Sequence, residues 1–107
     1  MAVKLANMAA SRLAANIGPA DLSIQLRAGD GDRFPVLTGA DDWFPLALVN
    51  DLAQTEFLRC TARVGDTLTV RRGREGSVAR AYSVGDVVEL RLTLEALTAL
   101  RDQEEAP

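Results

Sequence analysis

Two runs of alternating apolar and polar residues, joined by a short turn, most constrain what this chain can fold into. The first run spans residues 56–64 and the second spans residues 67–71, with Gly65-Asp66 between them. Alternation with a period of two is typical of half-buried strands, and a Gly-Asp pair is a common two-residue hairpin turn. With the apolar run 46–49 before them, these runs predict a three-stranded antiparallel meander over residues 46–71. The side chains expected to face inward are Leu58, Cys60, Ala62, Val64, Leu68 and Val70.

Two further segments of the chain alternate in the same way. One spans residues 22–28, and the other follows the Gly85-Asp86 turn. Turn residues recur at intervals of about ten residues, a pattern typical of small all-β folds. The predicted fold class is therefore mainly β, as a small antiparallel β barrel or sandwich. The side chains expected to face the core in these segments are Leu22, Ile24, Leu26, Ala28, Val88, Leu90, Leu92 and Leu94.

Helical signals are confined to three places. Ser77 is expected to cap a short helix near residues 77–82, and Thr93 or Thr98 is expected to cap a C-terminal helix. Residues 1–17 fit two descriptions. Their alanines and the helical spacing of their apolar residues slightly favour a helix, while the end of the segment also alternates as a strand does.

The length of the chain limits its organisation. A chain of 107 residues is most simply one domain, and it is long enough to fold without disulfides or a metal. We expect residues 1–101 to form a single β-rich domain and residues 102–107 to be a frayed acidic tail. No apolar run resembles a signal peptide or a membrane span, so synthesis in a cytoplasm is expected.

Charge is unevenly distributed along the sequence. The whole chain carries −3, but residues 59–80 contain six arginines against two acids, a net of +4. The flanking segments 21–56 and 86–107 are acidic, with −5 and −4. An acidic total gives no general attraction to nucleic acid or to acidic membranes. Arginine makes bidentate, weakly hydrated contacts that suit interfaces, so the basic segment is the main electrostatic feature.

The loop after the meander is the candidate functional surface. Its arginines admit three interpretations: a solvated loop paired with neighbouring acids, a surface that docks on an acidic protein, or a nucleic-acid site. The last is weakest, because no exposed aromatic residue is interleaved for base stacking. Glycines at 73 and 76 permit a positive φ and a sharp turn. The interface candidates are Arg71, Arg72, Gly73, Arg74, Glu75, Gly76 and Arg80.

The residues give little support to catalysis. The chain has no histidine, which removes the commonest general base and metal ligand. Cys60 lies on the inward face of a predicted strand and has no histidine to activate it. The Asp30-Gly31-Asp32 stretch lacks the later ligands of a calcium loop, and no phosphate-binding motif is present. We expect no enzyme activity, no cofactor and no metal.

The sequence resembles a module of tailed-bacteriophage tail-fibre and baseplate-associated proteins. The family pattern is roughly L-T-V-x-R-G-x-E-G-T, followed by an alanine and a Gly-Asp pair. Here Leu68 to Ser77 matches it, with serine in place of the usual threonine, and Ala79 and Gly85-Asp86 follow. Further matching stretches run from Ala10 to Ala14, Ser23 to Leu26, Phe34 to Pro35, Trp43 to Leu48 and Glu56 to Thr61.

The resemblance implies a noncatalytic structural component of a phage or prophage tail. Such a component would join tail or fibre parts through contacts with other tail proteins, without nucleic acid or membrane. It would form homo-oligomers in the virion tail after synthesis in the host bacterial cytoplasm. The alternative is a cytoplasmic tail-assembly factor or binding module. The resemblance also implies that residues 11–17 form a strand paired with residues 22–28.

Overall fold

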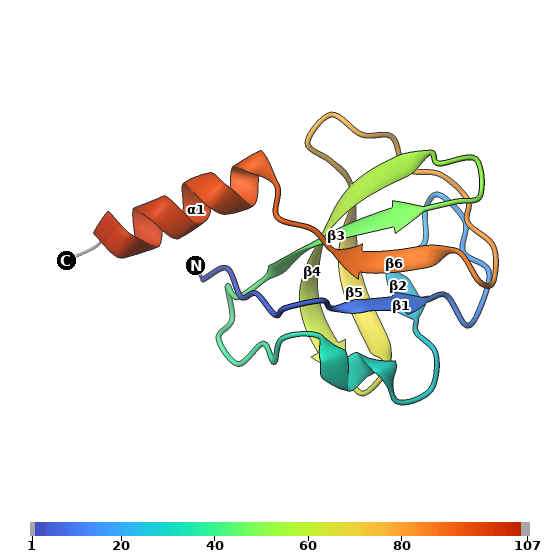
Figure 1. Cartoon of the computed structure of the whole chain (residues 1–107), viewed down its shortest axis with the longest axis horizontal. Helices are drawn as coiled ribbons and strands as arrows, with labels where there is room; N and C mark the ends of the chain where they lie inside the picture. Colours follow the sequence, from blue (N-terminus) through green and yellow to red (C-terminus); the bar gives the residue numbers. More distant parts are fainter. Residues whose placement is uncertain (1, 106–107) are drawn as a thin grey trace.

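The computed structural model describes residues 2–105 and shows six antiparallel strands in one strongly curled sheet (Figure 1). The strand order is β1-β6-β3-β4-β5-β2, so β3, β4 and β5 are neighbours in space as well as in sequence. The mainly β fold class and the predicted meander are therefore confirmed. The strands are β1 (Ala10–Arg12), β2 (Ser23–Gln25), β3 (Phe44–Val49), β4 (Thr55–Val64), β5 (Thr67–Arg74) and β6 (Val87–Leu90).

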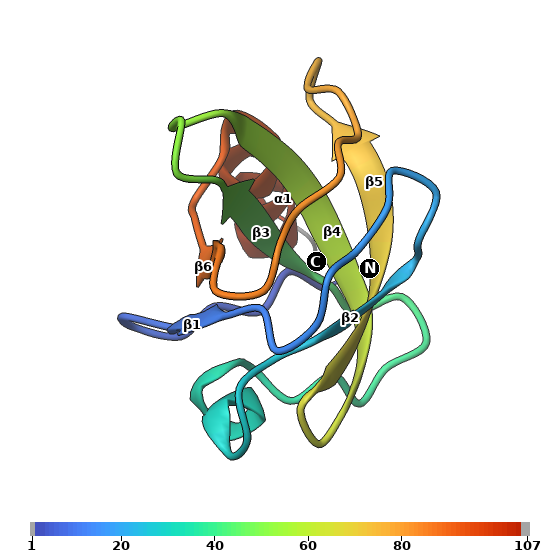
Figure 2. The same cartoon turned by 90° about the vertical axis from the view of Figure 1, so that its right-hand side faces the viewer.

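Backbone contacts just beyond the two edge strands bring the edges of the sheet together. An antiparallel bridge pairs Leu13 with Leu26. Beside it, the Ala14 N–H donates to the Gln25 carbonyl at 2.8 Å, and the Arg27 N–H donates to the Arg12 carbonyl at 3.2 Å. These bonds give the edge strands partners for part of their length. The sheet consequently wraps around its core like a barrel, as the view in Figure 2 shows.

The N-terminal segment is not a helix, so the slight preference for one was wrong. Its regular part is β1, which pairs with β6 through Ser11 opposite Val88. Met8, just before this strand, has a φ of 56° in the left-handed region, which interrupts any helix there. The expected pairing of residues 11–17 with 22–28 is confirmed at the Leu13–Leu26 bridge only.

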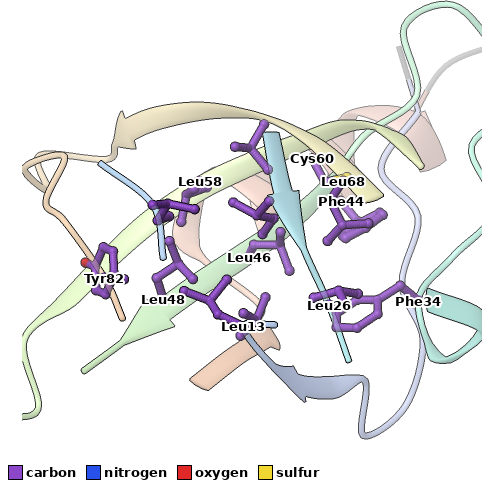
Figure 3. Packing of buried hydrophobic residues seen from close by; sticks show 14 of the residues in the cluster. Leu13, Leu26, Phe34, Phe44, Leu46, Leu48, Leu58, Cys60, Leu68 and Tyr82 are labelled. Carbon is purple, nitrogen blue, oxygen red and sulfur yellow. The ribbon is translucent and has the colours of Figure 1, made fainter. Parts of the chain in front are cut away.

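The main core lies inside the curl of the sheet (Figure 3). Within it, Phe34 packs against Phe44, with ring centroids 5.7 Å apart. The buried residues confirm the central part of every predicted strand face. Burial of their Leu, Val and Phe side chains supplies most of the stabilisation of the fold. The buried cluster contains Ala9, Leu13, Ile17, Ile24, Leu26, Phe34, Phe44, Leu46, Leu48, Leu58, Cys60, Leu68, Val70, Tyr82 and Val88.

Several residues near strand ends were predicted to point inward but are exposed, and the hairpin of β4 and β5 shows why. The two-residue turn makes Val64 a direct partner of Thr67, so both lie on one face of the sheet. Because the next residue, Leu68, is buried, Val64 must point outward, and it is 79% exposed. A bulge at Thr61 lets Cys60 return to the inward face. The other exposed residues that were expected inside are Leu22, Ala28, Ala62, Leu92 and Leu94.

A short 3-10 helix, η1 (Asp30–Arg33), packs against the turn between β4 and β5. The Asp66 carboxylate accepts the Gly29 N–H at 2.9 Å and the Gly31 N–H at 2.7 Å. These backbone hydrogen bonds lower the pKa of Asp66. A Cβ at Gly31 would lie 1.9 Å from the Gly65 carbonyl oxygen, so this close approach requires glycine.

The chain ends in helix α1 (Leu94–Glu105), which projects away from the sheet (Figure 1). The Thr93 hydroxyl accepts the Ala96 N–H at 3.2 Å, which confirms Thr93 as the cap. Ala96 packs with Val3 and Trp43 in a second small core. Residues 102–105 of the expected tail continue the helix, whereas residues 106–107 lie outside the described part.

The projecting helix gives the molecule a long axis of 43 Å against 29 and 23 Å for the other two. Its twelve residues are too few to cross a bilayer, since a transmembrane helix needs about 20 apolar residues. Within residues 2–105, no helix is long and apolar enough to span a membrane.

Candidate functional site

Most of the predicted loop belongs to a strand. β5 continues through Arg74, so Arg71 to Arg74 lie in the sheet and the turn begins at Glu75. Gly73 has a φ of 61° and Gly76 a φ of 79°, which confirms the expected positive φ at both glycines. Glu75 also has a positive φ, of 54°, a conformation that costs a non-glycine residue free energy and often accompanies a functional surface.

The expected helix near residues 77–82 is absent, and Ser77 has a different role. Residues 77–81 have no regular structure, and Tyr82 forms an isolated bridge with Ile17. The Ser77 hydroxyl donates to the Arg74 carbonyl at 2.6 Å and accepts the Phe57 N–H at 2.9 Å. It therefore fastens the returning loop to β4 and β5 in place of capping a helix.

A buried carboxylate, Glu56, holds the base of this loop. The residue is 0% exposed, and four donors surround its two oxygens. Oε2 accepts Arg72 Nε–H at 2.8 Å and the Gly73 N–H at 2.9 Å. Oε1 accepts Arg72 Nη2–H at 2.9 Å and the Arg80 N–H at 3.0 Å. A buried charge is tolerated when it is paired and fully hydrogen-bonded in this way.

All the hydrogen-bond donors of the Arg72 side chain are likewise paired, so this arginine stabilises the fold and is not exposed on a surface. Its side chain is 5% exposed. Besides Glu56, the guanidinium donates to the carbonyls of Gly18 and Asp21 at 2.8 Å and of Arg80 at 2.6 Å. Its five N–H groups thus all have acceptors. The interface candidate Arg72 therefore hydrogen-bonds its own strand to three other segments of the chain, at Gly18 and Asp21, at Glu56 and at Arg80.

A register shift in β5 separates this internal arginine from its outward neighbours. Arg71 is opposite Arg59 of β4, whereas Arg74 is opposite Phe57, so β5 has one more residue than β4 between these pairs. Because of this bulge, Arg71 and Arg74 both lie on the outer face while Arg72 turns inward. Three guanidinium groups, two of them predicted, consequently gather on the outer face of β4 and β5.

These arginines line a pocket of about 220 Å³, which we call the arginine pocket. Arg59 lies over the Trp43 ring with its Cζ 4.0 Å from the ring centroid, a cation–π contact. Arg59 also pairs with Glu95 of α1, and Arg74 lies 4.0 Å from the same carboxylate. The lining residues are Ala40, Asp41, Asp42, Trp43, Arg59, Thr61, Arg71 and Arg74.

The arginine pocket contains hydrogen-bond donors without partners, beside the carboxylates of Asp41 and Asp42. Among the described residues, four buried side-chain polar atoms lack a partner, and three of them belong to pocket residues: Trp43 Nε1, Arg59 Nε and Arg74 Nε. Arg71 is exposed and forms no ion pair with any side chain that the structure describes. The Asp42 carboxylate accepts the Gly39 N–H at 2.8 Å, a bond that lowers the pKa of Asp42. The arrangement suits an anionic group that brings acceptors.

A second hollow adjoins the pocket on the other side of Glu95. This apolar groove, of about 500 Å³, lies between the loop and the start of α1. Glu75 lines it and accepts the Glu95 N–H at 3.3 Å, so the loop contacts the first turn of the helix. Gly76 and Arg80 are exposed outside both hollows. The groove residues are Phe57, Glu75, Arg91, Leu92, Thr93, Leu94 and Glu95.

The sequence analysis missed Arg59, Trp43 and Glu95 as parts of the site. Arg59 could have been found, because the predicted hairpin register places it beside the arginines of β5. Trp43 has no polar cluster beside it in the sequence, and it is a core residue, being 3% exposed. Glu95 reaches the site only because α1 starts beside β4, a placement that no local pattern indicates.

The comparisons and the described side chains identify no known active site. No protein-family model and no curated protein matches the sequence. Within the described residues, no group of three or more His, Cys, Asp or Glu side chains is arranged to hold a metal ion. The site must therefore be interpreted from its own geometry.

Cys60 is expected to be unreactive in the folded protein. Burial raises the pKa of its thiol to about 12, so the neutral thiol persists at pH 8 and thiolate forms only as the pH approaches that value. Iodoacetamide at pH 8 should leave the native protein unmodified by mass spectrometry, while protein in urea should gain one adduct. Rapid alkylation of native protein would show that the thiol is accessible.

Proposed function

We propose that the protein is a noncatalytic structural component of a phage or prophage tail that joins tail or fibre parts through protein–protein contacts. The observation that carries this proposal is the donor-rich arginine pocket on two long, paired strands. Arginines fixed on a sheet lose little conformational freedom on binding, which favours recognition of carboxylates on another protein.

Two further observations support a joining role over catalysis. The sequence has no histidine, and Cys60 is buried in the core. The adjoining apolar groove exposes Leu92 at 48% and Leu94 at 77%, beside the arginines. Apolar area next to a charged rim is the usual composition of protein interfaces. The assignment to a tail comes from the resemblance of the Leu68–Ser77 stretch and its neighbours to phage tail modules.

The Arg71→Glu variant tests the role of the pocket. Arg71 is exposed and has no ion pair among the described residues, so the melting temperature should stay nearly unchanged. The variant should be lost from virions of the phage that encodes it, because like charges across an interface cost several kcal/mol. Occupancy is measured by quantitative mass spectrometry of purified virions, with Arg27→Glu as the exposed, matched control.

Each result has a distinct meaning. Normal occupancy of Arg71→Glu in virions would refute the pocket as the joining surface. Absence of the wild-type protein from finished virions would favour the assembly-factor alternative. Tight binding of wild type to duplex DNA near physiological salt would favour a nucleic-acid site, since a small basic patch alone loses its affinity there.

A further inference from the structure

Unpaired donors gather where α1 meets the sheet. Of the four buried side-chain polar atoms without a partner among the described residues, three lie there: Trp43 Nε1, Arg59 Nε and Arg74 Nε. A buried donor without an acceptor destabilises the folded state that buries it. Glu75, whose carboxylate accepts the Glu95 N–H at 3.3 Å, adds a left-handed backbone conformation with a φ of 54°. The docked position of the helix therefore carries an unfavourable free-energy term.

Little apolar surface holds α1 in place against this term. Of the α1 side chains that the structure describes, only that of Ala96 is buried, and it packs with Val3 and Trp43. Ala99 and Leu100 pack on this small core while partly exposed, and no described side chain of α1 belongs to the main core. Burial of so few methyl groups contributes little. A helix of twelve residues is also marginal in water by itself.

Polar contacts supply the rest of the docking. The Glu95 carboxylate lies 2.5 Å from Arg59 Nη2 and 4.0 Å from Arg74 Nη2. At the other end of the helix, the Val3 N–H donates to Gln103 Oε1 at 2.6 Å. The Glu95 side chain is 40% exposed, so water and salt weaken its ion pairs. The helix is consequently held by a few contacts at its two ends and by one buried alanine.

We propose that α1 opens and closes as a unit while the sheet stays folded. In the closed state, α1 buries Trp43 and its Glu95 carboxylate holds Arg59 and Arg74. In the open state, these three side chains are hydrated, and the unpaired donors find water. Residues 91–93 belong to neither β6 nor α1 and connect them, so they are the hinge. The projection of the helix away from the sheet leaves room for this motion (Figure 1).

The closed state is an autoinhibitory contact for the arginine pocket. Glu95 pairs with Arg59 and Arg74 there, whereas Arg71 forms no ion pair with a described side chain. A carboxylate of a partner that takes the first two arginines must displace Glu95. Binding and opening then favour each other by the same factor. This regulatory role rests on the proposed function, but the opening of α1 does not.

Hydrogen exchange of the native protein, followed by NMR, tests the opening. Amides 97–101 of α1 should exchange at least about a hundredfold faster than those of β3 and β4, because local opening has a lower free energy than global unfolding. These amides should exchange at similar rates. The indole N–H of Trp43, the single tryptophan, should exchange through the same opening, because α1 covers this residue.

Two variants should separate the helix from the sheet. Glu95→Gln should speed exchange of amides 97–101 by about two- to fivefold, the effect of a partly exposed ion pair, and leave the strands unchanged. Glu56→Gln should speed exchange of the strands by at least about a hundredfold, since it breaks a buried ion pair, and leave amides 97–101 unchanged. Asp102→Asn is the matched control in the same helix, because Asp102 pairs only with the adjacent Arg101 among the described residues. It should not speed exchange in α1.

Three results would overturn the inference. Exchange of α1 and of the strands at one rate would place the helix in the cooperative unit of the sheet. Rates that rise steadily from residue 97 to residue 101, with a Trp43 indole as slow as β3, would show fraying of the helix end alone. Unchanged exchange of α1 in Glu95→Gln would show that the ion pairs do not hold the helix. None of these results would refute the joining role, which is judged by virion occupancy.

Discussion

Replacing Glu56 with glutamine is expected to destabilise the protein by about 3–5 kcal/mol, the usual cost of removing one partner of a buried ion pair. The carboxylate accepts four hydrogen bonds, two on each oxygen. The amide would keep one oxygen and place an NH2 group against two of the donors. Because domains of this size are stable by only about 5–15 kcal/mol, much of the total would be lost.

Urea denaturation followed by circular dichroism measures this effect. Glu89→Gln is the matched control, since Glu89 is a strand glutamate with a partly exposed side chain paired to Arg91. It should change stability by no more than about 1 kcal/mol. A double variant, Glu56→Leu with Arg72→Leu, should be less destabilised than either single change. Equal stability of Glu56→Gln and wild type would contradict the structural role of the pair.

Val88→Asp is expected to unfold the domain, because a buried and unpaired charge costs several kcal/mol. Val88 is 0% exposed and lies on the interior strand β6, opposite Ser11 of β1 on one side and Leu48 of β3 on the other. Leu92→Asp, four residues later, should change stability by no more than about 0.5 kcal/mol, because Leu92 follows the end of β6.

The pair of variants tests where the last strand ends. Circular dichroism should show loss of the sheet signal for Val88→Asp and a native spectrum for Leu92→Asp. If Leu92→Asp also unfolded the protein, the alternating face would extend beyond Leu90 and the end of β6 would be misplaced.

The sequence predicted the centre of the fold because alternation reports burial locally. Residues such as Leu58, Leu68 and Val88 lie in strand interiors, where both neighbours keep the period of two. The sequence-based prediction failed where pairing with another strand determines which way a side chain points. Val64 is exposed because the turn fixes its pairing with Thr67, and that constraint conflicts with the alternation of β4 until a bulge resolves it.

The predictions of a helix in the N-terminal segment and of a helix near residues 77–82 were wrong for a related reason. Local propensity favoured a helix in residues 1–17, but the strand β6, about 80 residues away, supplies the backbone partners of β1. Ser77 has the hydroxyl of a helix cap, but that hydroxyl bonds Phe57 and Arg74.

The candidate site was predictable in composition and not in arrangement. The basic segment 59–80 does contain the three arginines of the pocket. Arg72 cannot be told from Arg71 and Arg74 by charge or spacing, because its inward turn depends on a bulge and on Glu56. A glutamate at the start of a strand looks like an ordinary solvated residue until its four donors are placed around it.

The hydrogen bonds of Arg72 affect how this small protein unfolds locally. Loops of a folded domain usually unfold locally, at a lower free energy than the whole. Here the turn at Gly18 and Asp21 and the loop at Arg80 share one guanidinium with the buried Glu56. Releasing either segment leaves a buried donor or acceptor unmatched. The two loops, which lie more than 50 residues apart in the chain, therefore belong to the same cooperative unit as the sheet.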